Sequence, residues 1–124
     1  MRQIKFRGKR TDTGEWIYGD LLTSNGTECE ISDWNDVVYS RYDVDPDTVG
    51  QFTGLLDKNG KEVYEGDIIT DSDGDVGQMC WDEGCLEYYT QYNDGLQDRF
   101  SCWHPCEVVG NNFDNPELME GGEE

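Results

Sequence analysis

Basic residues are scarce in this sequence, and most of them lie at its beginning. The 124 residues include nine lysines and arginines against 28 acidic residues, which gives a net charge of −19. Five of the nine fall in the first ten positions, which contain no acid: Arg2, Lys5, Arg7, Lys9 and Arg10. The rest of the chain has four basic residues against all 28 acids, a charge of −24. This charge repels phosphate backbones, so we expect no direct nucleic-acid binding.

Long apolar runs are also absent. None approaches the ~18 residues of a membrane-spanning helix, and the charged start lacks the apolar segment of a signal peptide. We therefore expect a cytoplasmic protein without a membrane partner. Disulfides are rare in that compartment, and an odd number of cysteines does not pair completely, so free thiols are expected at Cys29, Cys80, Cys85, Cys102 and Cys106.

Histidine occurs once, at His104, which leaves little room for His-based catalysis. Cys102 would share one face of a strand with His104, so a Cys/His nucleophile pair is the catalytic alternative to two structural side chains. Residues 50–54 contain two glycines but lack the Lys-Ser/Thr ending of a phosphate-binding loop. Paired carboxylates carry no information in a chain with 28 acids. We therefore predict no catalytic residue, no enzyme activity and no cofactor.

Cysteine and histidine are concentrated in the second half of the chain, in a pattern that permits a zinc site. Zinc takes four nitrogen or sulfur ligands in a tetrahedral array, usually as two close pairs. The candidates are Cys80, Cys85, Cys102 and Cys106, with His104 as a substitute. Their spacings are not the usual Cys-x2-Cys, so unligated thiols are the simpler interpretation. A zinc-stabilised domain or zinc-dependent enzyme is the lower alternative.

Three alternating aspartates, Asp71, Asp73 and Asp75, resemble the start of a calcium-binding loop. An EF-hand needs glycine at its sixth position and glutamate at its twelfth, but this chain has Val76 and Asp82 there. The glycine between the last two aspartates instead suits a tight hairpin turn. We interpret the segment as a turn between strands.

The first residues alternate in a way that predicts a half-buried strand. Ile4 and Phe6 would face the core, while Lys5 and Arg7 would face the other side. We expect this basic face to lie against acidic residues, either of the same chain or of another subunit. Lys5 and Arg7 are therefore interface candidates.

Turn residues divide the remaining chain into further short strands, which predicts a mainly β fold. Strands are expected within residues 15–22, 28–31, 62–64, 67–70, 76–81, 86–92 and 107–110. A glycine at position 19 suggests a bulge or bend. Aspartate followed by proline near residues 45 and 114 is typical of helix starts, so one or two single-turn helices are expected.

The beginning of the chain recurs in its middle. Five positions recur 46 residues later, four with the same residue and one with valine for isoleucine: Phe6, Gly8, Gly14, Ile17 and Tyr18 match Phe52, Gly54, Gly60, Val63 and Tyr64. After a one-residue insertion, Gly19-Asp20 reappears as Gly66-Asp67. We therefore expect two similar β-hairpin units. The expected division is an N-terminal β unit at 1–49, an SH3-like barrel or related open roll at 50–113, and a short capped turn with an acidic tail at 114–124.

Several motifs together resemble the YopX family of small bacteriophage and prophage proteins. They are IKFRGK at 4–9, WIYGDL at 16–21, DPDTVGQFTG at 45–54, GKEVYEGDII at 60–69, VVGN at 108–111 and NPEL at 115–118. The resemblance covers nearly the whole chain. It implies a mostly β fold with an SH3-like C-terminal half, expression in the cytoplasm of a bacterial host, and a homo-oligomer. The cysteines are not part of this pattern.

We therefore expect a non-enzymatic phage accessory protein that acts by contact with a host or phage protein. Tyr88, Tyr89 and Tyr92 lie in one predicted strand and are candidates for that contact, because tyrosine is enriched in interface hot spots. A specific form of this hypothesis is an acidic DNA mimic, suggested by the charge of −24. The alternative is a self-assembling structural subunit, in which the basic first strand pairs with the acidic body of another copy.

Overall fold

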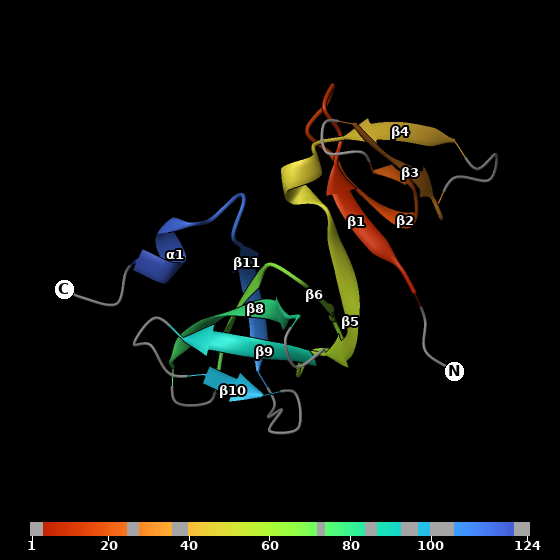
Figure 1. Ribbon diagram of the computed structural model, residues 1–124. Coiled ribbons are helices and arrows are strands. Elements are labelled where there is room, and N and C mark those ends of the chain that lie inside the picture. The colour runs from red at the N-terminus through yellow and green to blue at the C-terminus, as the bar shows by residue number, and fades with distance from the viewer. Residues whose placement is uncertain are drawn as a thin grey trace. The chain divides into compact units, whose positions relative to one another are not determined.

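The computed structural model describes residues 4–24, 28–35, 40–71, 74–83, 87–92, 97–99 and 106–120. They form a mainly β structure with two antiparallel sheets, one 3-10 turn and one short α-helix (Figure 1). The chain divides into two units, Met1–Phe52 and Thr53–Glu124. The domain boundaries expected from the sequence, at 1–49, 50–113 and 114–124, stay predictions. Within the described ranges, no helix has both the length and the apolar character needed to cross a bilayer.

The N-terminal unit holds β1 to β4 and the start of β5, which belong to a six-stranded sheet with the order β4-β3-β2-β1-β5-β6. β1 therefore lies inside the sheet, paired with β2 on one side and with the start of β5 on the other. The strands are β1 (Phe6–Lys9), β2 (Trp16–Ser24), β3 (Cys29–Asp33), β4 (Arg41–Val44) and β5 (Gly50–Leu56).

A small apolar core fills one face of this sheet. It consists of Ile17, Cys29, Ile31 and Val44, with Phe6, Leu21, Tyr42 and Val49 packed against it. Glycine is required at position 19, because a Cβ there would lie 1.8 Å from the backbone oxygen of Ser32. The predicted bulge at Gly19 is wrong. The register shifts instead between Leu21 and Thr23, where Leu22 is the extra residue.

The predicted orientation of the first strand is also partly wrong. Ile4 lies before β1 and is 60% exposed, whereas Arg7 is only 7% exposed. Phe6 does pack against the core, as expected. The reason is that the face opposite the core carries tryptophan side chains, so a long cationic side chain can be buried there against a ring.

A 3-10 turn, η1 (Pro46–Thr48), leads from β4 to β5. Its N-cap is Asp45, whose Oδ1 accepts a hydrogen bond from the N–H of Asp47 over 3.0 Å. The aspartate–proline pair therefore starts a single turn, as predicted. The Oγ1 of Thr48 accepts the N–H of Lys9 over 2.9 Å, which fixes this turn to the end of β1.

The repeated hairpin is present in both halves, but only in part. Gly14 and Gly60 lie in the turns after β1 and β5, with φ of 78° and 83°. The copies diverge at the Gly-Asp pair. Gly19 lies within the continuous strand β2, whereas Gly66 has a φ of 93° in the turn between two strands.

The C-terminal unit contains the end of β5, its neighbour β6, and a five-stranded sheet with the order β10-β9-β8-β7-β11. Its core consists of Val63, Ile69, Met79, Tyr88, Cys106 and Val108. The elements are β6 (Glu62–Tyr64), β7 (Asp67–Thr70), β8 (Val76–Asp82), β9 (Glu87–Tyr92), β10 (Gln97–Arg99), β11 (Glu107–Asn111) and α1 (Glu117–Glu120).

This five-stranded sheet is open within the described residues. β10 and β11 are its two edges and do not pair with one another there, so a closed SH3-like barrel is not confirmed. The segment after β11 lies against the sheet. A Cβ on Gly110 would lie 2.6 Å from the side-chain oxygen of Asn115 and 3.0 Å from Leu118. The glycine therefore lets the second predicted helical turn, α1, pack closely.

Candidate functional site

The basic residues of β1, and Lys5 just before it, lie over aromatic rings of their own unit. The Nζ of Lys5 lies 5.3 Å from the centre of the Trp34 ring. The guanidinium carbon of Arg7 and the Nζ of Lys9 lie 4.9 and 5.8 Å from the centre of the Trp16 ring. The register between β1 and β2 explains both contacts with Trp16. Lys9 is directly opposite Trp16, and Arg7, two residues before Lys9 in the same strand, faces the same side of the sheet. We call these five residues the cation–aromatic cluster.

Arg10, the next basic residue, is held by neighbours in the same unit. Its Nε and Nη2 donate to the two carboxylate oxygens of Asp12 over 2.9 and 2.8 Å, and its Nη1 lies 3.6 Å from the carboxylate of Glu15. Its guanidinium carbon lies 4.2 Å from the centre of the Tyr42 ring. The side-chain hydrogen bonds between Arg10 and Asp12 raise the pKa of Arg10 and lower the pKa of Asp12.

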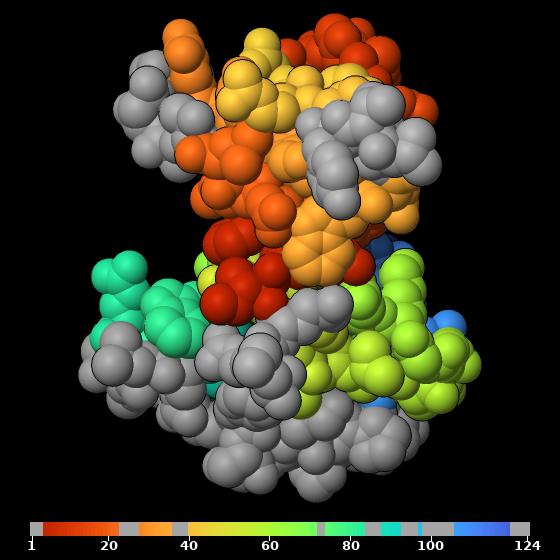
Figure 2. Space-filling model, turned by 90° about the vertical axis from the view of Figure 1, so that its right-hand side faces the viewer, coloured from red at the N-terminus to blue at the C-terminus, as the bar shows by residue number. Residues whose placement is uncertain are grey.

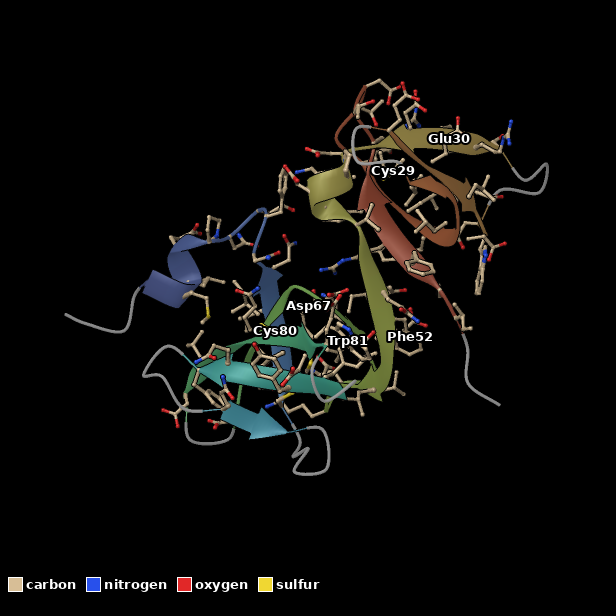
Figure 3. The ribbon with its side chains drawn as sticks, viewed as in Figure 1. Cys29, Glu30, Phe52, Asp67, Cys80 and Trp81 are labelled. Atoms are coloured by element: carbon tan, nitrogen blue, oxygen red, sulfur yellow. The ribbon has the colours of Figure 1, made fainter. Side chains whose placement is uncertain are left out.

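A polar cleft of about 330 Å³ opens beside this arginine. It is lined by residues 10–12 of the turn after β1, Glu30 of β3 and residues 41–43 of β4. The N–H of Thr11 donates to the carbonyl oxygen of Asp43 over 3.1 Å, which joins the turn to β4. Figure 2 shows the turn (red) and β4 (yellow) together at one end of the unit. Glu30 lies on the side of β3 away from the buried Cys29 (Figure 3).

The charges around the cleft are mixed. Glu30 is directly opposite Asp43 in the ladder between β3 and β4, and Arg41 is opposite Ser32. Among the described residues, no ion pair joins Arg41, Glu30 or Asp43 to another side chain. Besides the paired side chains of Arg10 and Asp12, the cleft thus presents one guanidinium and two carboxylates. This lining suits charged side chains of a protein better than a small molecule, whose sites are usually mostly apolar.

The structure does not bring the two described zinc candidates together. Cys106 belongs to the core of the C-terminal unit, next to Met79. Cys80 follows Met79 in β8, so alternation places it on the opposite face of the sheet (Figure 3). Both are free thiols, as is Cys29. Cys85, Cys102 and His104 lie outside the described residues.

Burial opposes ionisation of both thiols, whereas zinc binds the thiolate. It raises the pKa of Cys106 to about 11, with Asp57 and Asp71 adding to the effect. It also raises the pKa of Cys80. Within the described residues, no cluster of three histidine, cysteine or acidic side chains is placed to hold a metal ion.

The aspartate-rich segment between β7 and β8 forms a hairpin turn, as interpreted from the sequence. Gly74 has a φ of 86°, and its N–H donates to the carbonyl oxygen of Asp71 over 3.0 Å. The Oδ1 of Asp71 accepts the N–H of Asp75 over 2.9 Å. Asp73 lies outside the described residues.

The tyrosine strand is β9, and its three tyrosines differ in exposure. Tyr88 lies in the core with 4% of its surface exposed. Its ring packs edge-on against the ring of Trp81, with 4.8 Å between the ring centroids. Little of Tyr88 is therefore available for contact with a partner. Tyr89 and Tyr92 are half-buried and stay predictions as contact residues. Trp81 is 37% exposed and, like the tyrosines, is a contact candidate by residue type, so it also stays a prediction.

Two buried carboxylates organise the C-terminal unit. The Oδ1 of Asp57 accepts the N–H groups of Asn59 and Lys61, both over 2.9 Å, and its Oδ2 accepts the N–H of Val108 over 3.0 Å. Burial alone would raise the pKa of Asp57, but these three donors outweigh it and the pKa lies below its usual value. Asp57 thus joins the turn after β5 to β11.

The second buried carboxylate is Asp67, at the start of β7 (Figure 3). It is 2% exposed, and its Oδ2 accepts the N–H of Tyr64 over 2.7 Å. Its counterpart in the sequence repeat, Asp20, is exposed. The Gly-Asp pair therefore has a buried structural role only in its second copy.

A family model described as YopX protein matches residues 5–120, which is nearly the whole chain. The chain belongs to the YopX family. Among solved structures, this YopX-family chain is similar to the crystal structure of protein EF1440 from Enterococcus faecalis, with a TM-score of 0.55 and 22% sequence identity. The match covers 96% of this chain and 99% of that chain. At this identity the likeness shows the fold alone. A comparison with curated proteins found no match.

Proposed function

We propose that this YopX-family protein is a non-enzymatic accessory protein of phage or prophage origin, which acts in the bacterial cytoplasm by binding another protein. The observation that supports this is how charge is distributed over the described surface. The described basic side chains among the first ten residues lie over aromatic rings of their own unit: Lys5, Arg7, Lys9 and Arg10. Ten acidic residues are exposed: Asp12, Glu15, Asp20, Glu28, Asp43, Asp47, Asp75, Glu83, Asp114 and Glu117.

Exposed cations are far fewer: among the residues whose exposure the structure describes, they are Arg41, Lys58 and Lys61. A basic protein surface would therefore be attracted to this chain and oriented by it. Several large apolar side chains of the two units are also exposed and offer additional contact points: Ile4, Leu22, Trp34, Leu56, Trp81, Val109 and Phe113.

The specific form of this proposal is mimicry of DNA. Proteins that bind nucleic acid present lysine and arginine to a chain of phosphates, and a surface of well-separated carboxylates can occupy the same site. Such binding is electrostatic, so its affinity should fall steeply as salt is added. The partner would then be a host enzyme or regulator that acts on nucleic acid.

The test is capture of partners from a bacterial lysate on the immobilised chain, followed by elution with duplex DNA. A nucleic-acid enzyme that DNA displaces, and whose purified form binds more weakly at higher salt, is the expected result. Absence of any such protein, or binding that neither DNA nor salt affects, would contradict the proposal.

Two variants with equal change in charge would locate the binding surface. One carries Asp20→Asn, Glu28→Gln and Asp47→Asn in the N-terminal unit. The other carries Asp75→Asn, Glu83→Gln and Glu117→Gln in the C-terminal unit. The variant that weakens binding more identifies the unit that carries the binding surface. Equal weakening by both would mean that only net charge matters. All six residues are exposed, so neither variant removes a core contact.

The alternative function, a self-assembling subunit, needs a surface other than β1. β1 is paired on both sides, so it has no open edge for another copy. Its basic side chains are also engaged within the cation–aromatic cluster. The third alternative, a zinc-dependent protein, would need ligands beyond Cys80 and Cys106, which lie on opposite faces of their sheet.

A further inference from the structure

Three charged side chains line the polar cleft of the N-terminal unit without an ion pair among the described residues: Glu30, Arg41 and Asp43. The other two charged residues of the lining, Arg10 and Asp12, pair with one another. Arg41 and Asp43 are exposed, and Glu30 is half-buried. The cleft therefore offers charges of both signs to a molecule outside the chain.

The two carboxylates belong to one pair of opposite residues. Glu30 of β3 is directly opposite Asp43 of β4. The carbonyl oxygen of Asp43 accepts the N–H of Thr11, so the backbone groups of Asp43 point away from β3. In a pair that no backbone hydrogen bonds join, the two side chains lie closest together, and like charges there repel one another. A cation between the two carboxylates would remove this repulsion.

An arginine side chain is the cation that suits this pair. A guanidinium is planar and has five N–H donors in a fixed fork, so it can donate to two carboxylates at once, whereas a lysine ammonium is a compact and more strongly hydrated charge. The cleft volume of about 330 Å³ leaves room for a long side chain. A metal ion suits the cleft less well, because no group of three acidic, cysteine or histidine side chains is placed to hold one in the part of the chain that the structure describes.

Arg41 adds a second requirement for the ligand. It lies two residues before Asp43 in β4, so both side chains face the same side of the sheet, roughly 6.6 Å apart along the strand. Side chains two positions apart in an extended peptide have the same spacing and also share a face. An acidic residue two positions from the arginine would therefore meet Arg41 while the arginine meets the two carboxylates.

We propose that the polar cleft binds an extended segment of a partner protein in which an arginine and an acidic residue are two positions apart. The arginine donates to the carboxylates of Glu30 and Asp43, and the acidic side chain accepts from Arg41. This inference rests on the proposed function, because it names the chemistry by which a protein partner is recognised. It also goes beyond that function, since a partner surface with cations alone would leave Arg41 facing a like charge.

The experiment uses the full wild-type chain and two peptides with blocked ends and no net charge. Both contain one arginine and one glutamate in a run of threonines, which favour an extended backbone. In the first peptide the two charges are two positions apart, and in the second they are adjacent and face opposite sides. NMR titration of the isotope-labelled chain should show shifts at Glu30 and at residues 41–43 with the first peptide. The second peptide should bind at least about threefold more weakly.

Variants of the chain test each end of the cleft. Glu30→Gln should weaken binding of the first peptide about threefold, whereas the matched control Glu117→Gln, at an exposed position of the other unit, should leave it unchanged. Arg41→Gln should also weaken binding about threefold, although it makes the chain more acidic. Because the peptides carry no net charge, the chain's charge of −19 does not by itself attract them.

Four results would overturn the proposal: no shifts at Glu30 and residues 41–43, equal affinity for the two peptides, equal weakening by Glu117→Gln, or unchanged binding in Arg41→Gln. If a cleft variant does not fold, the shifts of the wild-type chain and the comparison of the two peptides decide instead.

These outcomes are distinct from those that test the proposed function. Capture of a nucleic-acid enzyme that DNA displaces, together with no binding of either peptide at the cleft, would keep the proposed function and overturn the inference about the cleft. Selective binding of the first peptide without capture of such an enzyme would support the cleft as a binding site and contradict DNA mimicry.

Discussion

The two units of this protein bury charge of opposite sign and stabilise it by different means. In the N-terminal unit, the buried cation Arg7 lies over the ring of Trp16. In the C-terminal unit, the buried anions Asp57 and Asp67 accept hydrogen bonds from backbone N–H groups. The comparison shows that one hairpin plan, present in both units, accommodates either sign of charge. The neighbours decide which sign can be buried.

The difference follows from what each group requires. A guanidinium can lie on the negative face of an aromatic ring, and a strand supplies such a face when a tryptophan is opposite or diagonal to it. A carboxylate needs donors, and turns supply backbone N–H groups that no ladder uses. Asp57 lies at such a turn, whereas Arg7 lies within a strand.

The largest effect is expected from removing the carboxylate of Asp57. Asp57→Ala leaves the N–H groups of Asn59, Lys61 and Val108 without their acceptor and should lower the free energy of unfolding by roughly 2–4 kcal/mol. Asp57→Asn keeps one side-chain acceptor and should cost less. Urea denaturation of both variants measures this, and a loss below about 0.5 kcal/mol in Asp57→Ala would show that the C-terminal unit does not depend on its buried anion.

The same residue predicts how stability changes with pH. The pKa of Asp57 is lower in the folded chain than in the unfolded chain. Its stabilisation is therefore complete above the ordinary aspartate pKa of about 3.9 and is lost as the pH falls below that value toward the folded pKa. Stability measured from neutral to acid pH should fall less in Asp57→Asn than in the wild type. Identical slopes would contradict the assignment.

An intermediate effect is expected at Asp67, for which the sequence repeat provides a matched control. Asp67→Ala removes the acceptor of the Tyr64 N–H inside the unit and should cost about 1–3 kcal/mol. Asp20→Ala changes the equivalent but exposed residue and should stay within about 0.5 kcal/mol. Denaturation curves of the two variants compare the copies directly. Similar losses would show that the Gly-Asp pair has the same role in both units.

The smallest effect is expected for the buried cation. A double-mutant cycle of Arg7→Met and Trp16→Leu should give a coupling free energy of about 0.5–2 kcal/mol. Both single variants keep much of the apolar volume, so the cycle isolates the attraction between charge and ring. Lys58 is exposed, and pairing Lys58→Met with Trp16→Leu gives the control, which should show no coupling. Additive losses for Arg7 and Trp16 would mean that the ring contributes packing alone.

Much of the fold could be predicted because its strands carry local signals. Alternation, glycine turns and the aspartate–proline pair located most strands and the single turn η1. β4 was missed although Tyr42 and Val44 alternate with charged residues, and β5 was indicated only by the recurrence of Phe6 and Gly8 as Phe52 and Gly54. β10 could not be found, since its sequence Gln-Asp-Arg has no apolar residue and its position depends on pairing with β9.

The candidate site was less predictable, because it depends on register. The sequence indicated that Lys5 and Arg7 share a face, but not that tryptophans share it with them. Trp16 faces Lys9 only because of how β1 and β2 pair, and Trp34 follows a different strand.

The hydrogen bond between Asp57 and Val108 joins residues 51 positions apart in the sequence. During synthesis the ribosome releases the N-terminal unit, which ends at Phe52, before either partner of this bond has emerged. The first unit can therefore complete its own sheet early, whereas the Oδ2 of Asp57 lacks its donor, the N–H of Val108, until β11 has been synthesised. The C-terminal unit should consequently be the last part of the nascent chain to gain protection from proteases, and its folding should be limited by the arrival of a single late strand.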